Sequence, residues 1–326
     1  MRLSVLGGGS WGTALAAHAV SAGHELRIWV RSPGIAASLN DRRENPAYLP
    51  GVELPAGLRA TTSLGEAVTD AELAIVVVPS EYCREIYRQA GPHLPKGALL
   101  VSATKGLETD TLRRMTEVAA SEAPGHPLAV LSGPSFALEV AKALPTAVVV
   151  ASHDHAEAER VQRALATRAF RVYSSEDVVG VEVAGAVKNV IAIAAGIVDG
   201  LGYGHNTVAA LVTRGLAEIS RLAVALGGRP DTLAGLAGLG DLVLTCTGGL
   251  SRNRMVGQRL GRGQSLAEAC AGIHPEGVRT TLAAVALADR HAIDLPIARQ
   301  MKAVLHEGKA PREALEELML RRLKRE

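Results

Sequence analysis

The sequence predicts an α/β fold: a doubly wound, mostly parallel sheet covered by helices, followed by an all-α domain. Apolar strands and helical patterns alternate from the start of the chain to Glu176. Runs such as AIVVV, at residues 74–78, are typical of strands that are buried on both faces of a parallel sheet. From Val178 onward every periodic stretch is helical, which is the pattern of a separate helical layer. We therefore expect two domains, residues 1–181 and residues 182–326.

Composition excludes several function classes. The 326 residues carry a net charge of +2 and an aromatic fraction of 3%, which leaves neither the basic surface nor the stacking side chains that nucleic-acid binding needs. The three cysteines, at positions 83, 246 and 270, lack the spacing of a metal site or of a disulfide framework. No signal peptide precedes the strand near Leu3, so we expect a cytoplasmic protein without stable membrane insertion.

The first predicted element is a buried strand at residues 2–7, which leads directly into a glycine-rich turn. Gly7, Gly9 and Gly12 form the pattern G-x-G-x-x-G, and a helical run and a second strand, Glu25–Val30, follow. Glycines at these spacings let backbone N–H groups approach a pyrophosphate at the start of a helix. A strand, glycine turn, helix and strand within about thirty residues therefore predict a Rossmann-type dinucleotide-binding domain.

The end of the second strand indicates which dinucleotide is bound. An acidic residue there would bind the ribose 2′-hydroxyl of NAD, but this chain has Arg31 followed by Ser32. A guanidinium and a hydroxyl suit a 2′-phosphate, so we expect NADP to be preferred and NAD to be tolerated. The alternative is that Arg31 is an ordinary solvated loop residue.

Further strands and helices alternate through the first half of the chain, and helices alone fill the second half. The periodicity predicts strands at 58–61, 73–78, 99–103, 128–131, 146–151 and 171–173. It predicts intervening helices at 81–89, 110–121, 136–143 and 156–168. In the second half the predicted helices are 182–199, 207–226, 231–238, 252–261, 265–271, 277–289, 296–307 and 311–323.

Polar, glycine-marked turns follow several of these strands, where a doubly wound sheet places its ligands. One such turn, at residues 102–106, contains Lys105, and another spans residues 132–136. At this edge of the sheet the amine of Lys105 could reach a bound anion. The alternative is a solvated lysine without a special role.

Lys188 is the most informative residue of the helical half. It lies in the almost wholly apolar run 183–200, and the residues three and four positions away are apolar or small. Its own helix face offers no carboxylate, and a buried amine needs a specific partner or a depressed pKa. Residues 183–198 are too short for a membrane span and carry a Lys–Asn pair, so we expect a core helix with Lys188 as a functional group. The alternative is a lysine whose stem covers apolar surface while its amine reaches water.

Two other stretches of the helical half carry polar groups among small residues. Asp241 is the single acid in residues 238–242 and is either a helix N-cap or a catalytic carboxylate. The glycine-rich residues 245–254 open a helix with Arg252 and Asn253. Such a helix start is a good receiver for phosphate or carboxylate.

Six sequence blocks, in order along the chain, carry a family resemblance. They are GGGSWGTALA, SATKGLE, LSGPSFALEV, VAGAVKNVIAIAAG, GLAGLGDLVLTCTG and SRNR. Together they extend from Leu3 to at least Val278, and the chain closely resembles the bacterial NAD(P)-dependent glycerol-3-phosphate dehydrogenases. The resemblance implies reversible hydride transfer between NAD(P)H and dihydroxyacetone phosphate, which gives sn-glycerol 3-phosphate, the precursor of the phospholipid backbone.

The resemblance also implies roles for individual residues. Lys188 matches the catalytic lysine that exchanges a proton with the substrate oxygen, while Lys105 stabilises that oxygen and Asp241 orients Lys188. The implied substrate-binding positions are Lys105, Gly133, Ser135, Asn189, Asp241, Thr245, Ser251, Arg252 and Asn253. The implied cofactor contacts are Gly7, Gly9, Ser10, Trp11, Gly12, Arg31, Lys105, Ala137, Arg252 and Glu276.

Two other functions fit parts of this pattern. A hydroxy-acid or opine dehydrogenase shares a nucleotide-binding half and a helical half, and a carboxylate substrate would distinguish it. A protein that binds NAD(P)H without turnover would not need Lys105, Lys188 and Asp241 together. The apolar helical half also predicts a homodimer, although no residue pattern indicates the interface.

Overall fold

The computed structural model describes residues 1–322, which fold into two compact units. The first unit comprises Met1–Lys105 and Arg113–Glu182, and the second comprises Gly106–Leu112 and the described chain from Val183 onward. The chain passes between the units at three places, because residues 106–112 leave the first unit and then return to it. The compact units therefore differ from the two predicted sequence domains, because residues 106–112 belong to the second unit.

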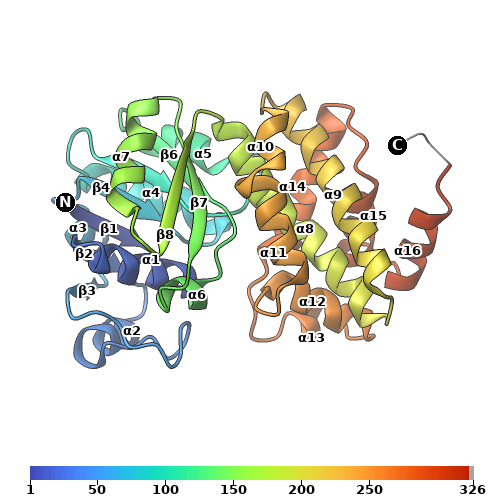
Figure 1. The fold of residues 1–326 in the computed structure, drawn as a ribbon, viewed down its shortest axis with the longest axis horizontal. Helices are drawn as coiled ribbons and strands as arrows, with labels where there is room; N and C mark the ends of the chain where they lie inside the picture. The colour runs from blue at the N-terminus through green and yellow to red at the C-terminus, as the bar shows by residue number, and fades with distance from the viewer. Residues whose placement is uncertain (323–326) are drawn as a thin grey trace. The chain divides into compact units, whose positions relative to one another are not determined.

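The first unit is built on one sheet, in which the described residues form eight strands in the order β3-β2-β1-β4-β5-β6-β7-β8 (Figure 1). Neighbouring strands run parallel, except that β7 is antiparallel to β6. The doubly wound, mostly parallel sheet is therefore confirmed. The strands are β1 (Arg2–Leu6), β2 (Glu25–Trp29), β3 (Leu58–Thr61), β4 (Leu73–Val76), β5 (Leu99–Ser102), β6 (Leu128–Ser132), β7 (Thr146–Ala151) and β8 (Phe170–Ser175).

Helices cover both faces of this sheet, and each face has its own apolar core. Successive residues of a strand feed opposite cores, as the pleat requires: Val5 of β1 lies in one core and Leu6 in the other. The first core is closed by α1 (Ser10–Ser21), α2 (Pro33–Ala37), η1 (Ser38–Arg42), α6 (Ala137–Ala141) and α7 (His155–Leu165). The second is closed by α3 (Leu64–Val68), α4 (Ser80–Ala90) and α5 (Met115–Glu122), and η2 (Gly91–His93) follows α4.

Local chemistry shifts several predicted boundaries. The helix expected at 110–121 begins at Met115, because Leu112 takes a left-handed conformation with φ of 62° and Glu117 accepts the backbone N–H of Arg114 at 2.8 Å. The strand expected at 73–78 ends at Val76. The pattern does not predict α2, η1 or α3, because five residues are too few to show a helical period.

The second unit is helical, as predicted (Figure 1). The helix expected at 231–238 is divided into a short α-helix and a π-helical turn, and a further helix follows at once. The last predicted helix, 311–323, ends at Met319, and residue 323 lies outside the described residues. The elements are α8 (Val178–Gly200), α9 (His205–Ala225), α10 (Pro230–Ala234), η3 (Leu236–Gly240), α11 (Asp241–Thr247), α12 (Arg252–Gly261), α13 (Leu266–Ala269), α14 (Glu276–Arg290), α15 (Pro296–His306) and α16 (Pro311–Met319).

The long helix α8 supplies the core of the second unit. It has 23 residues and begins at Val178, just after Asp177, whose carboxylate accepts the N–H of Gly180 at 2.8 Å. The helix extends beyond the predicted run 183–198 at both ends, and its full length and hydropathy would allow it to cross a membrane. Its most apolar 18-residue window is 100% buried inside the structure, which is the burial expected of a core helix.

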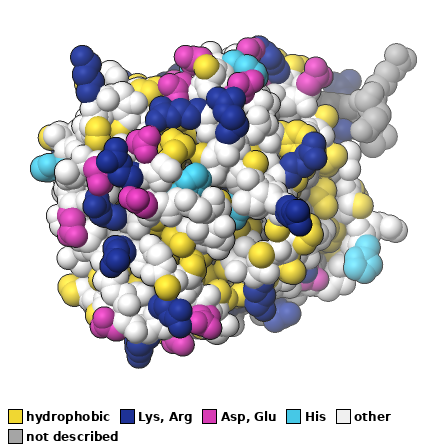
Figure 2. All heavy atoms as spheres, turned by 60° about the vertical axis from the view of Figure 1, so that its left-hand side comes forward, with side chains coloured by type: hydrophobic (Ala, Val, Ile, Leu, Met, Phe, Trp, Pro, Cys, Tyr) yellow, Lys and Arg dark blue, Asp and Glu magenta, His cyan; other side chains and the backbone are white. Residues whose placement is uncertain are grey.

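Charged side chains of both signs are interspersed on the face of the molecule that Figure 2 shows. Lysine and arginine side chains there lie among aspartate and glutamate side chains, with apolar side chains between them. A mixed surface of this kind does not supply the single-sign field that attracts a polyanion over long distances.

Candidate active site

The glycine turn between β1 and α1 is shaped by close backbone contacts. Gly7 has a φ of 130°, and a Cβ there would lie 2.5 Å from the carbonyl oxygen of Val77. A Cβ on Gly12 would lie 1.9 Å from the carbonyl oxygen of Gly7, so this glycine lets the helix pack tightly on the turn. A Cβ on Gly9 would meet no atom within 4 Å. Two of the three glycines therefore shape the turn, and Gly9 borders open space at the helix start.

Residues outside the motif hold this turn in place. Asn45 is buried, and its Nδ2 donates to the carbonyl oxygen of Gly8 at 2.9 Å and to the hydroxyl of Thr13 at 2.8 Å. The hydroxyl of Ser10 donates to the carbonyl oxygen of Tyr48 at 2.5 Å. Sequence reasoning missed Asn45, because the loop around it shows no periodicity or motif.

The turn fits the pyrophosphate of a dinucleotide. Gly9 is the N-cap of α1, a helix of 12 residues, and its side-chain-free backbone leaves the helix start accessible. First-turn N–H groups and the helix dipole favour an anion at such a position. Trp11 packs partly buried against the first core. Gly7, Gly9, Ser10, Trp11 and Gly12 thus form one continuous structure at the carboxyl end of β1.

Arg31 lies just beyond the carboxyl end of β2 and is exposed. The hydroxyl of the neighbouring Ser32 accepts the N–H of Ile35 at 3.4 Å and caps α2. Ser32 therefore has a structural role that the sequence did not reveal, whereas the guanidinium of Arg31 lies at the surface where the predicted 2′-phosphate would be bound.

Three of the predicted substrate-binding residues of the first unit lie together. The amine of Lys105 donates to the carbonyl oxygen of Gly133 at 2.8 Å, and the hydroxyl of Ser135 donates to the same oxygen at 3.0 Å. Gly133 has a φ of 131°, and a Cβ there would lie 3.0 Å from the Cα of Val148. The carbonyl of Gly133 is therefore the point that joins the two side chains. Ala137 is close by in the chain, at the first position of α6.

The second unit provides the ionic partner that the sequence predicts for Lys188. The amine of Lys188 donates to the carboxylate of Asp241 and, at 2.9 Å, to the hydroxyl of Thr245. That hydroxyl donates in turn to the carbonyl oxygen of Asp241 at 2.6 Å. The three residues are 5%, 1% and 5% exposed, so the ion pair is almost completely removed from water. Such a buried pair is retained only where its geometry and hydrogen bonds compensate for the loss of water.

Asp241 is the first residue of α11 rather than its N-cap, since Gly240 occupies the capping position. The N-cap alternative for Asp241 is therefore wrong. Cys246, which follows Thr245, is also buried, and burial raises the pKa of its thiol to about 12. The neighbour of the ion pair is thus a neutral thiol at physiological pH.

A chain of amide hydrogen bonds lies beside the ion pair. The Nδ2 of Asn253 donates to the Oδ1 of Asn189 at 2.9 Å, and the Nδ2 of Asn189 donates to the carbonyl oxygen of Gly185 at 3.4 Å. The Oδ1 of Asn253 accepts the backbone N–H of Gly277 at 3.0 Å. This chain joins α8, α12 and α14 in the interior of the second unit.

The start of α12 is capped and carries an exposed cation. The hydroxyl of Ser251 accepts the N–H of Arg254 at 3.2 Å, which makes Ser251 the N-cap of this helix of 10 residues. Arg252, the first helical residue, is exposed. Glu276 is the first residue of α14 and is half-buried. The predicted residues of the second unit therefore lie on α8, α11, α12 and α14, except Ser251, which caps α12.

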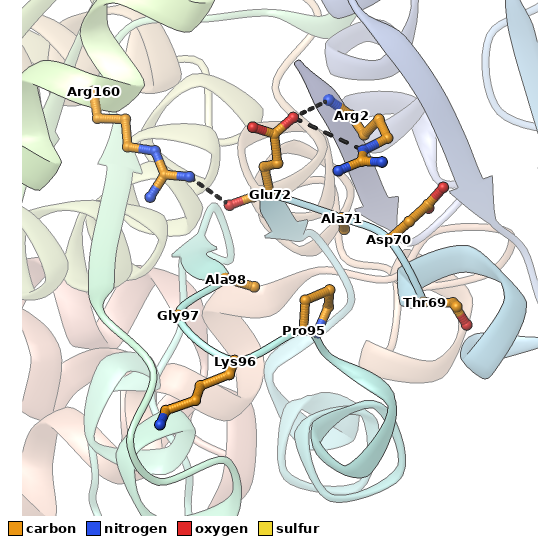
Figure 3. A pocket seen from close by; sticks show the side chains of 10 residues that line it. All are labelled: Arg2, Thr69, Asp70, Ala71, Glu72, Pro95, Lys96, Gly97, Ala98 and Arg160. Carbon is orange, nitrogen blue, oxygen red and sulfur yellow. Dashed lines mark hydrogen bonds and ion pairs between the residues drawn. The ribbon is translucent and has the colours of Figure 1, made fainter.

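A surface hollow in the first unit lies at the amino ends of β1 and β4 (Figure 3). The glycine turn follows the carboxyl end of β1. Most residues of the hollow precede or begin strands: Arg2 begins β1 and Glu72 directly precedes β4. Arg160 belongs to α7. Figure 3 shows Arg2 and Arg160 on either side of Glu72, whose carboxylate accepts the backbone N–H of Arg2 at 2.8 Å. That hydrogen bond lowers the pKa of Glu72. Ligands of doubly wound sheets bind at the carboxyl ends of strands, so this hollow is separate from the candidate site.

Two family models together cover most of the chain. The model for the N-terminus of NAD-dependent glycerol-3-phosphate dehydrogenase matches residues 2–158, and the model for its C-terminus matches residues 177–316. A relative from Koribacter versatilis, named glycerol-3-phosphate dehydrogenase (NAD(P)+), is 52% identical over 327 residues, which cover 98% of this chain and 97% of the relative.

Solved structures agree with these matches. A glycerol-3-phosphate dehydrogenase from Coxiella burnetii is 42% identical with a TM-score of 0.95, and the match covers 98% of this chain and 99% of that chain. A glycerol-3-phosphate dehydrogenase from Saccharomyces cerevisiae is 26% identical with a TM-score of 0.82, and the match covers 97% and 98% of the two chains. The chain therefore belongs to the family of NAD-dependent glycerol-3-phosphate dehydrogenases and is an NAD(P)-dependent oxidoreductase.

Proposed function

We propose that the protein reduces dihydroxyacetone phosphate to sn-glycerol 3-phosphate, reversibly, with NADPH or NADH. The observation that carries this proposal is the buried amine of Lys188, which donates to Asp241 and Thr245. A lysine buried in an apolar helix costs stability, so its presence there points to a function. Proton transfer to a reacting oxygen is a function that this amine can perform. The names of the relatives support the substrate.

Lys188 is the proposed proton donor. A bound dihydronicotinamide would supply the hydride for the keto carbon of the substrate. As negative charge develops on the substrate oxygen, the ammonium of Lys188 gives it a proton, and in the reverse direction the neutral amine takes the proton back. Asp241 and Thr245 accept hydrogen bonds from the same nitrogen, so they hold it in one position.

The phosphate of the substrate is assigned to the start of α12. The exposed guanidinium of Arg252 lies there, beside Ser251 and Asn253 and the N–H groups of the first helical turn. Binding the phosphate at one end of the substrate fixes the orientation of its keto carbon. Asn189 and Thr245 are proposed to line the same site.

Lys105, a residue of the first unit, is the second cation that we assign to the reaction. Lys105 is held by the carbonyl oxygen of Gly133, and we assign to it the electrostatic stabilisation of the developing oxyanion. Gly133 and Ser135 are assigned as further substrate contacts. Because Lys105 and Ser135 share one backbone acceptor, a displacement of Gly133 would disturb both side chains at once.

The cofactor is assigned to the turn that contains Gly7, Gly9 and Gly12. This assignment rests on the open space at Gly9 and on the accessible start of α1. Arg31 would bind a 2′-phosphate, so the proposed preference is NADPH over NADH. The remaining proposed contacts are Ser10, Trp11, Lys105, Ala137, Arg252 and Glu276.

In the cell, the product would supply the glycerol backbone of phospholipids. The chain would act in the cytoplasm as a homodimer, without nucleic-acid or membrane partners. The composition of the chain and the apolar helical half support these proposals.

The test is steady-state oxidation of NADPH and of NADH by the purified protein, with dihydroxyacetone phosphate as substrate. Unphosphorylated dihydroxyacetone is the control, because it offers the same carbonyl without the anion that Arg252 would bind. We expect rapid turnover that depends on the phosphate. An Arg31→Ala variant should lose the preference for NADPH and keep its rate with NADH.

Tight cofactor binding without turnover of dihydroxyacetone phosphate would contradict the proposed substrate. A screen of keto acids would then follow, because the same architecture would suit a carboxylate substrate. Equal rates with the phosphorylated and unphosphorylated ketones would contradict the role assigned to Arg252.

A further inference from the structure

Three residues of the amide chain, Asn189, Asn253 and Gly277, are each adjacent in sequence to a residue of the proposed site. Asn189 follows Lys188, the proposed proton donor. Asn253 follows Arg252, the proposed phosphate ligand, and Gly277 follows Glu276, a proposed cofactor contact. We call these three residues the amide bracket.

The bracket makes direct hydrogen bonds between three helices. Asn253 of α12 donates to Asn189 of α8 at 2.9 Å and accepts from the backbone N–H of Gly277 of α14 at 3.0 Å. Asn189 and Asn253 are 5% and 9% exposed, and Gly277 is buried. Because the bonds are shielded from water, breaking one would leave a buried polar group unsatisfied, which costs about 1–3 kcal/mol.

Gly277 has a second property that the sequence did not indicate. A Cβ at this position would lie 2.6 Å from the carbonyl oxygen of Asn189 and 2.8 Å from the Cδ1 of Ile193. The closest of these atoms belongs to the backbone of α8, so α14 or α8 would have to move. The missing side chain therefore allows the start of α14 to touch α8 at the residue that follows Lys188.

A similar contact holds α12 against α8. A Cβ on Gly257 would lie 2.0 Å from the carbonyl oxygen of Ile193, and a Cβ on Gly196 would lie 2.0 Å from the carbonyl oxygen of Arg254. Glycines on both helices thus allow the backbones to approach closely. This approach brings the side chain of Asn253 within hydrogen-bonding distance of Asn189.

We infer that the amide bracket is the positioning device of the second unit, and that Gly277 is a positioning residue for both Lys188 and Arg252. Its backbone N–H orients the amide of Asn253, and that amide orients Asn189 on the helix that carries Lys188. The inference rests on the proposed function, because it concerns the distance between the proton donor and the phosphate-binding cation. A misplacement of about 1 Å in such a pair can cost about 100-fold in rate.

The test compares Gly277→Ala with the control Gly204→Ala in the same unit. A Cβ on Gly204 would meet no atom within 4 Å, and Gly204 has a φ of −81°. Steady-state kinetics with dihydroxyacetone phosphate and with unphosphorylated dihydroxyacetone would be measured for both variants, together with their Tm.

For Gly277→Ala we expect kcat/KM for dihydroxyacetone phosphate to fall by about 10- to 100-fold. The preference for the phosphorylated over the unphosphorylated ketone should fall as well, because Arg252 is displaced from Lys188. Gly204→Ala should keep the wild-type kcat/KM for dihydroxyacetone phosphate and the wild-type preference for the phosphorylated ketone. Gly277→Ala could instead have a lower Tm but keep the wild-type kcat and the wild-type preference for the phosphorylated ketone. Gly277 would then have only a structural role, and the inference would be overturned.

A second measurement applies where Gly277→Ala does not fold. Asn189→Ala, Asn253→Ala and the double variant form a cycle that measures the coupling between the two amides. If the two amides act through one bracket, the effects of the two substitutions should not add. The double variant should then lose about as much preference for the phosphorylated ketone as the more affected single variant. Additive losses would overturn the inference.

The wild-type protein in the same assay tests the proposed function separately. If it does not turn over dihydroxyacetone phosphate, the proposed function fails and the bracket is judged from a crystal structure of Gly277→Ala. We expect the distance between Nδ2 of Asn253 and Oδ1 of Asn189 to lengthen beyond 2.9 Å in that structure. An unchanged distance would overturn the inference.

Discussion

The glycine turn and the lysine cluster differ in how their residues are brought together. The three motif glycines of the turn, Gly7, Gly9 and Gly12, lie within six consecutive residues, and backbone groups form the proposed binding surface. Lys188 meets Asp241 and Thr245 across separations of 53 and 57 residues. A local site is determined by spacing along the chain, whereas an assembled site depends on how closely helices pack. Substitutions should therefore act differently in the two regions.

The largest effect is expected at the centre of the assembled site. Lys188→Ala removes the proposed proton donor, so kcat should fall by about 10²- to 10⁴-fold. The dissociation constant of NADPH, measured by fluorescence titration, should stay the same because the glycine turn is untouched. Lys96→Ala, which removes an exposed lysine of the first unit, is the control. Near-normal turnover by Lys188→Ala would show that another group is the acid.

The next effect tests whether the assembled site separates binding from chemistry. Arg252→Ala removes a charged hydrogen bond worth about 1.5–3 kcal/mol, so KM for dihydroxyacetone phosphate should rise by about 10- to 100-fold, with a smaller change in kcat. Arg262→Ala, an exposed arginine just after the other end of α12, should leave KM unchanged. An unchanged KM for Arg252→Ala would place the phosphate elsewhere.

Two substitutions within the glycine turn separate shape from binding. Gly12→Ala places a Cβ 1.9 Å from the carbonyl oxygen of Gly7, and overpacking of this kind costs about 1–3 kcal/mol of stability. Gly9→Ala fills open space, so it should leave Tm unchanged and raise the dissociation constant of NADPH. Calorimetry and fluorescence titration distinguish the two variants. Unchanged NADPH binding by Gly9→Ala would contradict a pyrophosphate at this position.

The helical unit contains a second buried carboxylate, Glu218, which can be compared with Asp241. Glu218 of α9 accepts the N–H groups of Ile297 and Ala298 at 2.6 Å and 3.1 Å, at the start of α15. Arg221 and Asp294 also act on it electrostatically. Burial raises its pKa from 4.5 to about 7, whereas Asp241 has a lysine as its direct partner.

This carboxylate predicts a pH dependence of stability. Between pH 4.5 and about 7 the folded chain keeps a proton on Glu218 that the unfolded chain has released. The raised pKa of Glu218 therefore contributes fully to the free energy of unfolding below about pH 4.5. This contribution is lost as the pH rises towards about 7. Glu218→Gln should remove roughly 3 kcal/mol of this change in the free energy of unfolding, measured by urea denaturation across the pH range. Glu313→Gln, at an exposed residue of α16, is the control, and an equal slope in both variants would contradict the assignment.

Much of the fold follows from local patterns. The strands at 58–61 and 146–151 and the helix at 252–261 were predicted with their observed boundaries, because apolar periodicity and turn residues are local properties. The helix expected from residue 110 begins at Met115 because Leu112 is left-handed. The antiparallel pairing of β7 with β6 also has no local signal.

The candidate site divides in the same way. Gly7, Gly9 and Gly12 were predicted from a pattern, and the need of Lys188 for a partner was predicted from its apolar helix. The identity of that partner as Asp241 came from a family resemblance, and the structure shows the contact. Asn45 and Gly277 were missed, because an asparagine in a loop and a glycine in a helix carry no signal until their neighbours are known.

The sequence by itself determined the alternation of elements, the glycine turn and the presence of a polar group in an apolar helix. These are properties of spacing and periodicity, and each can be evaluated within one or two elements. The tertiary structure alone decided which helices meet α8, because that depends on backbones that approach closely at Gly196, Gly257 and Gly277. A contact between distant residues has no signature in the spacing of either one, so packing had to place Asn253 beside Asn189.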